Sequence, residues 1–229
     1  FITTDVLIYM SGERTALGLM AILTFFLILL MSRYQYLRIF TLFISIILIL
    51  LISFYIPSAK ERVVDLTLNQ IGVNEDSENL NYFTPIHDSL YKTSIKMFLD
   101  KPFLGHGPNT FREVCKNEKY KVGNYSCSSH PHNFYLQLLA ETGIIGFSVV
   151  LFLLLYIISV CIKQFITIIR KKDKKYLSDF QICILAALFL SLWPFLPTQN
   201  FFNNWINVIM YLPVGFYLCS LYSTKIKQM

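Results

Sequence analysis

Charged residues are scarce in this chain, and the shortage indicates its class. Only 15% of the 229 residues are charged, whereas 55% are hydrophobic and 16% are aromatic. Ordinary soluble domains have about 25% charged residues. Because the apolar residues lie in long blocks, the composition excludes a typical soluble domain and predicts a protein that crosses a membrane several times.

Signals of several other protein classes are also missing. The sequence has no zinc-finger, helix-turn-helix or RNA-recognition pattern, so its net charge of +6 does not indicate binding to nucleic acid. The first residues lack the basic stretch, apolar core and small-residue cleavage site of a signal peptide. Because the chain starts at Phe1 rather than at a methionine, we expect it to be the C-terminal part of a longer membrane protein.

Five apolar segments approach or exceed the roughly 17–25 residues that a membrane-spanning helix needs. They cover residues 15–31, 37–56, 142–169, 180–195 and 205–222. Basic residues follow the first, third and fifth segments, which places these ends on the cytoplasmic side. The long segment 57–141 then faces outward, and in a bacterium that side is the periplasm. The sequence therefore predicts one all-α, multi-pass bundle in the inner membrane with a long, partly helical periplasmic loop.

The outer loop contains helix signals of its own. Thr84-Pro85 is typical of a helix start, and Asp88 and Lys92 at i, i+4 spacing support a helix over 85–99. We expect an apolar stripe on this helix made by Ile86, Leu90, Ile95 and Phe98. The glycine-rich stretch 105–109 predicts a turn after it.

The same loop has two cysteines, Cys115 and Cys127. Because the periplasm is oxidising, we expect them to form a disulfide just before the histidines that follow. The alternatives are two free thiols or a zinc site that these cysteines share with His130 and His132. The spacing fits no standard zinc pattern.

A helix start is predicted at Ser128–Pro131, with Pro131 near the first helical position. His132 would then lie in the first turn, where free backbone N–H groups favour anions. The same helix dipole disfavours a protonated imidazole, so His132 would be neutral and able to accept a proton. This combination suits a base that works beside a phosphate group. The alternative is a histidine that only decorates a helix start.

Further polar residues share the predicted membrane face. His130, Asn133, Gln137 and Glu141 recur on one side of the expected helix. A carboxylate at the membrane edge is costly unless it is paired or solvated, so we expect Glu141 to make a buried contact or to lie in water. Arg14 stands at the outer end of the first segment. It can extend to the interface without a chemical role, or it can bind phosphate through its planar donors.

Three motifs resemble, in this order, the signatures of bacterial O-antigen ligases and the related O-antigen polymerases. They are SGERTAL at 11–17, KPFLGHGPNTF at 101–111 and HPHNFYLQLLAETGIIGF at 130–147. The resemblance implies a membrane-embedded, inverting glycosyltransferase that needs neither a metal nor a cofactor. Such an enzyme moves a glycan from a polyprenyl-diphosphate carrier, a membrane lipid, to an acceptor hydroxyl. For ligases the acceptor is the lipid A–core of lipopolysaccharide, and for polymerases it is the growing repeat on a second carrier.

The resemblance also assigns roles to residues. His132 would activate or orient the acceptor hydroxyl, and Arg14 would bind the diphosphate. Many relatives have an arginine on the loop helix where this sequence has His87. By position His87 takes that role, although Arg112 or Lys92 could supply it. The remaining members of the predicted substrate-binding set are His130, Asn133 and Glu141.

The sequence thus favours an O-antigen ligase, with a polymerase of the same family as the alternative. A transporter of polysaccharide or carrier lipid is a reading from another class, and a structural membrane subunit is a third. Transport calls for charged or broken-helix features near mid-membrane, and Pro213 is the one feature that leans that way. A structural subunit leaves the histidine, arginine and glycine-rich motifs unexplained.

Overall fold

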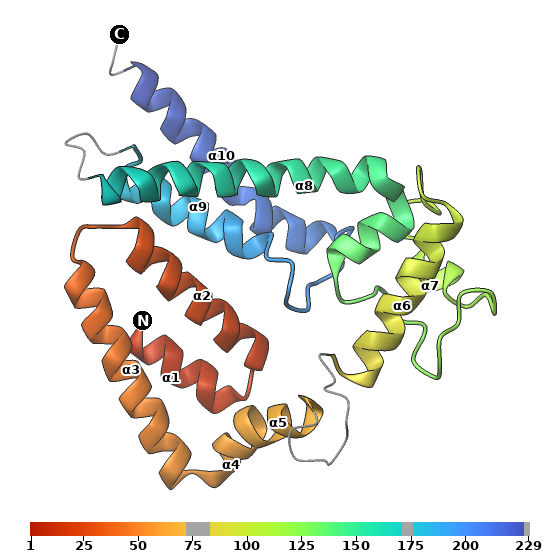
Figure 1. The fold of residues 1–229 in the computed structure, drawn as a ribbon, viewed down its shortest axis with the longest axis horizontal. Helices are drawn as coiled ribbons and strands as arrows, with labels where there is room; N and C mark the ends of the chain where they lie inside the picture. The colour runs from red at the N-terminus through yellow and green to blue at the C-terminus, as the bar shows by residue number, and fades with distance from the viewer. Residues whose placement is uncertain (72–82, 171–175, 227–229) are drawn as a thin grey trace. The chain divides into compact units, whose positions relative to one another are not determined.

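The computed structural model describes residues 1–71, 83–170 and 176–226, and these residues are helical with connecting loops and no strand (Figure 1). The predicted all-α class is therefore confirmed. The helices are α1 (Ile2–Ser11), α2 (Arg14–Leu30), α3 (Gln35–Tyr55), α4 (Pro57–Lys60), α5 (Leu66–Ile71), α6 (Pro85–Asp100), α7 (Phe111–Val114), α8 (Phe134–Ile169), α9 (Asp179–Ser191) and α10 (Asn204–Ile226). A π-helical turn, Glu61–Asp65, joins α4 to α5.

Each apolar segment expected to span the membrane contains a helix, although the helix in the fourth segment ends at Ser191 and not at residue 195. Within the described ranges, three helices are long and apolar enough to cross a bilayer, namely Gln35–Tyr55, Phe134–Ile169 and Asn204–Tyr222. The helices α2 and α9 are apolar but shorter. The chain is thus a helical membrane protein, and the order of five crossings with its cytoplasmic and periplasmic faces stays a prediction.

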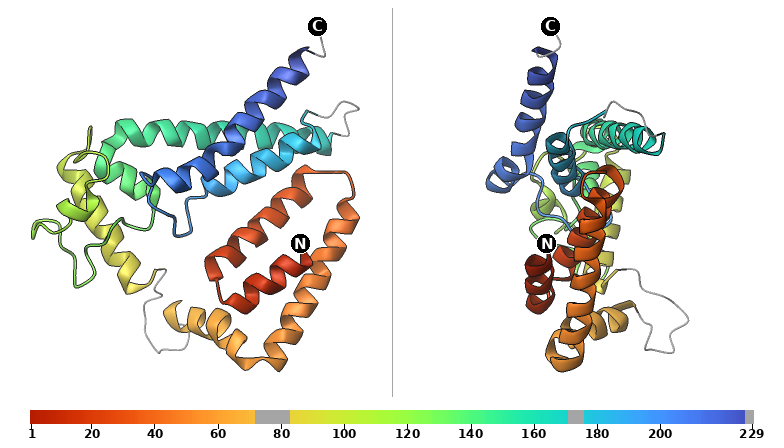
Figure 2. Two further views of the ribbon diagram at one scale, coloured as in Figure 1. Left: turned by 180° about the vertical axis from the view of Figure 1, so that it is seen from behind. Right: turned by 90° about the vertical axis from the view of Figure 1, so that its left-hand side faces the viewer.

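The chain forms two compact units. Unit 1 consists of Phe1–Asn81, Ser159–Leu190 and Val214–Met229, and unit 2 consists of Tyr82–Ile158 and Ser191–Pro213. In unit 1, α1 packs against both α2 and α3 (Figures 1 and 2). The hydroxyl of Ser45 on α3 donates to the side chain of Asp5 on α1 at 2.7 Å, which gives this buried polar group a partner. Unit 2 holds the histidines and is described by itself below.

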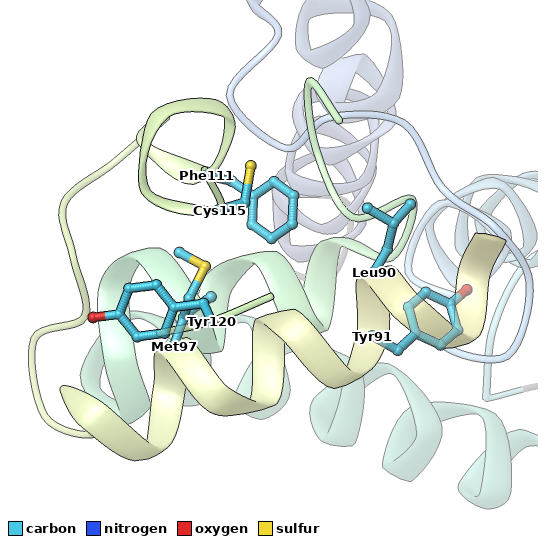
Figure 3. Packing of buried hydrophobic residues seen from close by; sticks show 7 residues of the cluster. Leu90, Tyr91, Met97, Phe111, Cys115 and Tyr120 are labelled. Atoms are coloured by element: carbon cyan, nitrogen blue, oxygen red, sulfur yellow. The ribbon is translucent and has the colours of Figure 1, made fainter. Parts of the chain in front are cut away.

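The core of unit 2 lies on one face of α6. This helix begins where the sequence predicts, since the Thr84 hydroxyl accepts the backbone N–H of His87 at 3.3 Å. Its buried face carries Leu90 and Met97, which pack with residues from the following loop and α8 (Figure 3). The expected apolar stripe is wrong in part, because Ile86 and Ile95 are 48% and 44% exposed.

The helix α8 is broken at Gly143, where it changes direction (Figure 1). Gly143 has φ 64° and ψ −165°, a conformation that is essentially restricted to glycine. The break frees the carbonyls of Ala140 and Glu141, which then accept the N–H groups of His106 at 3.1 Å and Gly107 at 2.8 Å.

The same break frees two N–H groups on its other side. Ile144 donates to the carbonyl of Pro102 at 2.8 Å, and Ile145 donates to that of Phe103 at 3.5 Å. The loop of the second motif thus replaces the helical hydrogen bonds that the third motif loses. This reciprocal exchange satisfies backbone groups that would otherwise be unpaired, and it explains physically why the two motifs belong together.

Candidate active site

Three histidines of unit 2 lie together. His87 comes from the first turn of α6, and His130 and His132 come from the segment before α8. The ring centroids of His130 and His132 are 4.2 Å apart, and those of His87 and His132 are 5.6 Å apart. The structure therefore places two of the predicted binding residues against the predicted catalytic histidine.

The start of α8 differs from the prediction. The first helical residue is Phe134, and Asn133 caps the helix because its Oδ1 accepts the N–H groups of Tyr135 at 3.0 Å and Leu136 at 3.1 Å. The expected start near Pro131 is wrong. His132 thus precedes the cap rather than lying in the first turn, and its φ of 57° is in the left-handed region.

The anion site expected at this helix end is not formed by free backbone groups. The N–H of Phe134 donates to Thr198 Oγ1 at 2.7 Å, and the N–H of Gln137 donates to the carbonyl of Asn133 at 2.9 Å. Together with the two groups capped by Asn133, these bonds satisfy the N–H groups of the first turn. These backbone groups are therefore not free to bind an anion.

The loop between α9 and α10 supports the segment that carries His132. The N–H of Thr198 donates to the carbonyl of His132 at 2.8 Å, and Asn133 Nδ2 donates to the carbonyl of Pro194 at 3.0 Å. Thr198 thus bonds the residue before the cap, His132, through its N–H group. It bonds the residue after the cap, Phe134, through its hydroxyl. Sequence reasoning missed Thr198. The signal that could have found it is a short polar stretch, Thr-Gln-Asn, on the same predicted side as the histidines.

The electrostatic environment keeps these imidazoles neutral. Burial lowers the pKa of His132 below its ordinary value of 6.5. Burial and then the nearby positive charge of a protonated His132 lower the pKa of His87. The pKa of His130 is lowered by the same causes, and the backbone of Thr198 opposes the shift. Near neutral pH, His132 is thus an uncharged imidazole that can accept a proton.

The two neighbouring histidines differ in their contacts. The Thr84 hydroxyl accepts the backbone N–H of His87 and lies 2.7 Å from its Nδ1, so it can donate its own proton there and leave Nε2 as a donor. His130 is only 8% exposed, and its Nδ1 lies 2.9 Å from the hydroxyl of Ser129. Its Nε2 has no hydrogen-bond partner within the described part of the chain. The backbone of Thr198 nevertheless lies close enough to this ring to raise its pKa.

Glu141 is fully buried, with 0% exposure. Its carboxylate accepts the backbone N–H groups of Asn109 at 2.9 Å and Phe111 at 2.6 Å, and Nε2 of Gln137 at 3.2 Å. The same amide of Gln137 reaches Asn200 in the α9–α10 loop at 2.8 Å. Glu141 thus makes the buried contact that was expected of it, and the contact joins the second motif to α8.

The three cationic residues considered for diphosphate binding lie on three different helices. Arg112 is exposed on α7, where its Nη2 lies 3.4 Å from Asn109 Oδ1. Lys92 pairs with Asp88 on α6 at 2.7 Å. Arg14 belongs to unit 1, where it begins α2 and donates to the Thr67 hydroxyl at 3.3 Å.

A cleft of about 440 Å³ opens beside the cap residue of α8. Its lining is mostly aromatic and aliphatic, with one ion pair, and consists of Phe83, Asp88, Tyr91, Lys92, Ile95, Asn133, Tyr135, Leu136 and Pro194. The lining draws on α6, the start of α8 and the α9–α10 loop. Apolar walls with few polar groups are typical of ligand sites, and this one adjoins the residue next to His132.

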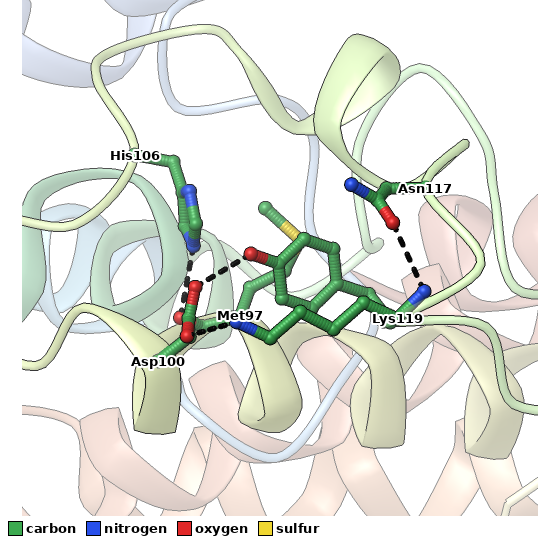
Figure 4. A network of polar contacts seen from close by, with 6 residues as sticks. Met97, Asp100, His106, Asn117 and Lys119 are labelled. Carbon is green, nitrogen blue, oxygen red and sulfur yellow. Dashed lines mark hydrogen bonds and ion pairs between the residues drawn. The ribbon is translucent and has the colours of Figure 1, made fainter.

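The loop between α6 and α8 is held by a disulfide and by contacts with α6. Cys115 and Cys127 form a disulfide with a Cα–Cα distance of 5.2 Å, so their sulfurs are not available for the zinc site considered above. His106 Nε2 lies 3.0 Å from the carbonyl of Met97, and the Tyr120 hydroxyl donates to Asp100 at 2.6 Å (Figure 4). The glycine-rich turn is therefore fixed on α6 and keeps the backbone groups of the second motif in place.

Fold and site together define a helical membrane protein in which a histidine cluster and a cleft lie at the start of a long apolar helix. The family described as O-Antigen ligase has a model that matches residues 1–151, and the chain belongs to this family. The match includes all three motifs and confirms the resemblance seen in the sequence. Neither a curated protein nor a solved structure matches the chain.

Proposed function

We propose that this protein is an O-antigen ligase. It transfers a glycan from polyprenyl diphosphate to the lipid A–core acceptor at the periplasmic face of the inner membrane. Membership of the family supports ligase- or polymerase-type activity in general. The observation that carries the proposal is the arrangement of His132, a neutral and half-buried imidazole between two other histidines and next to a cleft.

His132 accepts the proton of the acceptor hydroxyl, or orients that hydroxyl, as its oxygen attacks the anomeric carbon. The new glycosidic bond forms as the bond between that carbon and the diphosphate oxygen breaks. The configuration inverts because this is a single displacement, and the electron pair leaves with the diphosphate. The left-handed backbone of His132 is held by the Thr198 bond, so the ring is positioned before substrate arrives.

The diphosphate needs donors and positive charge. His87 offers its Nε2 as a donor next to His132, which supports its role in place of the arginine of relatives. As a largely neutral group it lacks fixed charge, and within unit 2 we assign that charge to Arg112. The binding of diphosphate by Arg14 stays a prediction from the resemblance alone. His130 adds a second imidazole, with its ring centroid 4.2 Å from that of His132.

The amide of Asn133 is occupied by the helix cap and by Pro194, and the carboxylate of Glu141 is occupied by three donors. Both residues therefore act as positioning groups. Asn133 fixes the start of the helix that follows His132, and Glu141 fixes the loop of the second motif on that helix.

The test is a deletion of the gene in the source bacterium, with plasmid-borne wild type and empty plasmid as controls. Polyprenyl-linked glycans and lipopolysaccharide are then extracted and their chain lengths measured. A ligase leaves long chains on the carrier and bare lipid A–core. Single repeats on the carrier, with at most one repeat on lipid A–core, would identify a polymerase instead. An unchanged profile would refute both and favour transport or a structural role.

A further inference from the structure

The tip of the second motif exposes large apolar side chains. Phe103 is 70% exposed and Leu104 is 72% exposed, and Leu99 at the end of α6 is 70% exposed. These residues follow one another closely in the chain, and none belongs to the core of unit 2. Single exposed apolar residues are normal on proteins, whereas a contiguous group indicates a surface that meets another apolar phase.

This tip is attached to the membrane-spanning part of α8. The carbonyls of Pro102 and Phe103 accept the N–H groups of Ile144 and Ile145, the first residues after the break. A Cβ atom on Gly143 would lie 2.3 Å from the Phe103 oxygen, so the backbones are in direct contact. The tip thus lies beside the first turn of the spanning segment, at the same height along the α8 axis.

The adjoining face of α8 is the kind of surface that lipid covers. Ile145, Val149, Phe152 and Tyr156 recur at i, i+4, i+7 and i+11 and are 56%, 67%, 69% and 50% exposed. These side chains lie in a helix that is long and apolar enough to cross a bilayer. The apolar tip therefore continues a lipid-facing stripe at its outer end.

The tip also has a positive charge of the kind found at a bilayer surface. Lys101 is exposed directly before Pro102, and a lysine at that level can reach anionic headgroups while its neighbours enter the acyl region. We propose that Leu99, Phe103 and Leu104 form a wedge that inserts into the outer leaflet beside α8. The wedge anchors the second motif to the membrane and so sets the depth of the segment that carries His132. The inference depends on the membrane helix and is independent of the proposed reaction.

The experiment places the photo-crosslinking residue p-benzoylphenylalanine at single aromatic positions of the full chain. The protein is reconstituted in nanodiscs of phosphatidylethanolamine and phosphatidylglycerol without polyprenyl lipid, irradiated and analysed by intact mass. Phe152, 69% exposed on α8, is the positive control. Tyr125, 54% exposed in the disulfide-closed loop, is the matched control outside the membrane.

We expect the Phe103 variant to gain a phospholipid adduct as the Phe152 variant does, and the Tyr125 variant to gain none. Absence of a phospholipid adduct at Phe103, with adducts present at Phe152, would overturn the wedge. A crosslink from Phe103 to a second protein chain would also overturn it, because the surface would then be an interface between copies. The unfolding temperature of each variant shows that the fold is retained.

Discussion

Replacing Gly143 by alanine should damage the fold far more than the same change at Gly215. At Gly143 the backbone has φ 64° and ψ −165°, a conformation that costs a residue with a side chain roughly 1–3 kcal/mol. The added Cβ would also lie 2.3 Å from the carbonyl oxygen of Phe103 and 2.4 Å from its carbon. Neither backbone can move away without breaking the hydrogen bonds between the loop and α8.

The cost follows from these terms. A buried backbone group left unpaired adds about 1–3 kcal/mol to the backbone strain, so Gly143→Ala should cost roughly 3 kcal/mol or more. For a chain of this size the unfolding temperature falls by about 2–4 °C per kcal/mol, which predicts a drop of roughly 6–12 °C. At Gly215 no atom lies within 4 Å of the added Cβ, and alanine in a helix is favoured over glycine by up to ~1 kcal/mol.

The assay is thermal unfolding of both variants, purified in the same detergent, together with glycan transfer in membranes. Gly143→Ala should unfold early and lose transfer, while Gly215→Ala should match or exceed the wild type in stability. Equal unfolding temperatures for Gly143→Ala and wild type would refute the reciprocal exchange between the second and third motifs. The further variant Gly105→Ala, with a Cβ 2.3 Å from the carbonyl carbon of Glu141, should behave like Gly143→Ala.

Further predictions concern pH, the supporting loop and the disulfide. Because burial lowers the pKa of His132 below 6.5, kcat/KM should be constant above pH 6.5 and fall only as the pH drops through the lower folded value; an acid limb centred above 6.5 would contradict a buried neutral base. The stability that neutral His132 contributes is likewise fully present above pH 6.5, the ordinary pKa of histidine. It is lost as the pH falls from there toward the lower pKa of the folded state. Thr198→Val leaves the N–H of Phe134 without its acceptor and should cost about 1–3 kcal/mol. It should lower kcat more than it raises KM, and Thr198→Ser should recover most of the loss; equal kinetics for the valine and serine variants would exclude the positioning role. The Cys115–Cys127 disulfide closes a loop with a sequence separation of 12. Replacing both cysteines by alanine should cost about 2–3 kcal/mol, and reductant should then lower the unfolding temperature of the wild type but not of the variant.

Local signals in the sequence predicted several elements well. The loop helix was expected over 85–99 and runs from Pro85 to Asp100, because its cap and its Asp88–Lys92 pair act within one or two turns. The apolar segments were predicted as helices from their length and composition, which are also properties of each segment alone.

Contacts between distant residues explain the errors. The start of α8 depends on Thr198, which lies 64 residues after Phe134, and no local pattern encodes that bond. The buried face of α6 depends on the loop packed against it, so Ile86 and Ile95 were placed wrongly inside. The break at Gly143 depends on its contacts with the second motif, and no local pattern encodes them.

The candidate site was predicted in part. The resemblance assigned separate roles to His132 and His87, and those roles stay predictions. The structure adds that the two rings lie 5.6 Å apart. Local pattern placed His132 in a helical turn, where it does not lie, because Asn133 is a better cap than the serines before Pro131 once its amide also bonds Pro194.

We propose above that glycan transfer depends on His132. The most direct measurement expresses His132→Ala in the deletion strain and examines lipopolysaccharide and carrier-linked glycans beside wild type, with membrane level and unfolding temperature as controls. We expect bare lipid A–core and long chains held on the carrier, although the variant is inserted and folded normally. A normal lipopolysaccharide ladder from His132→Ala would show that transfer does not depend on this histidine.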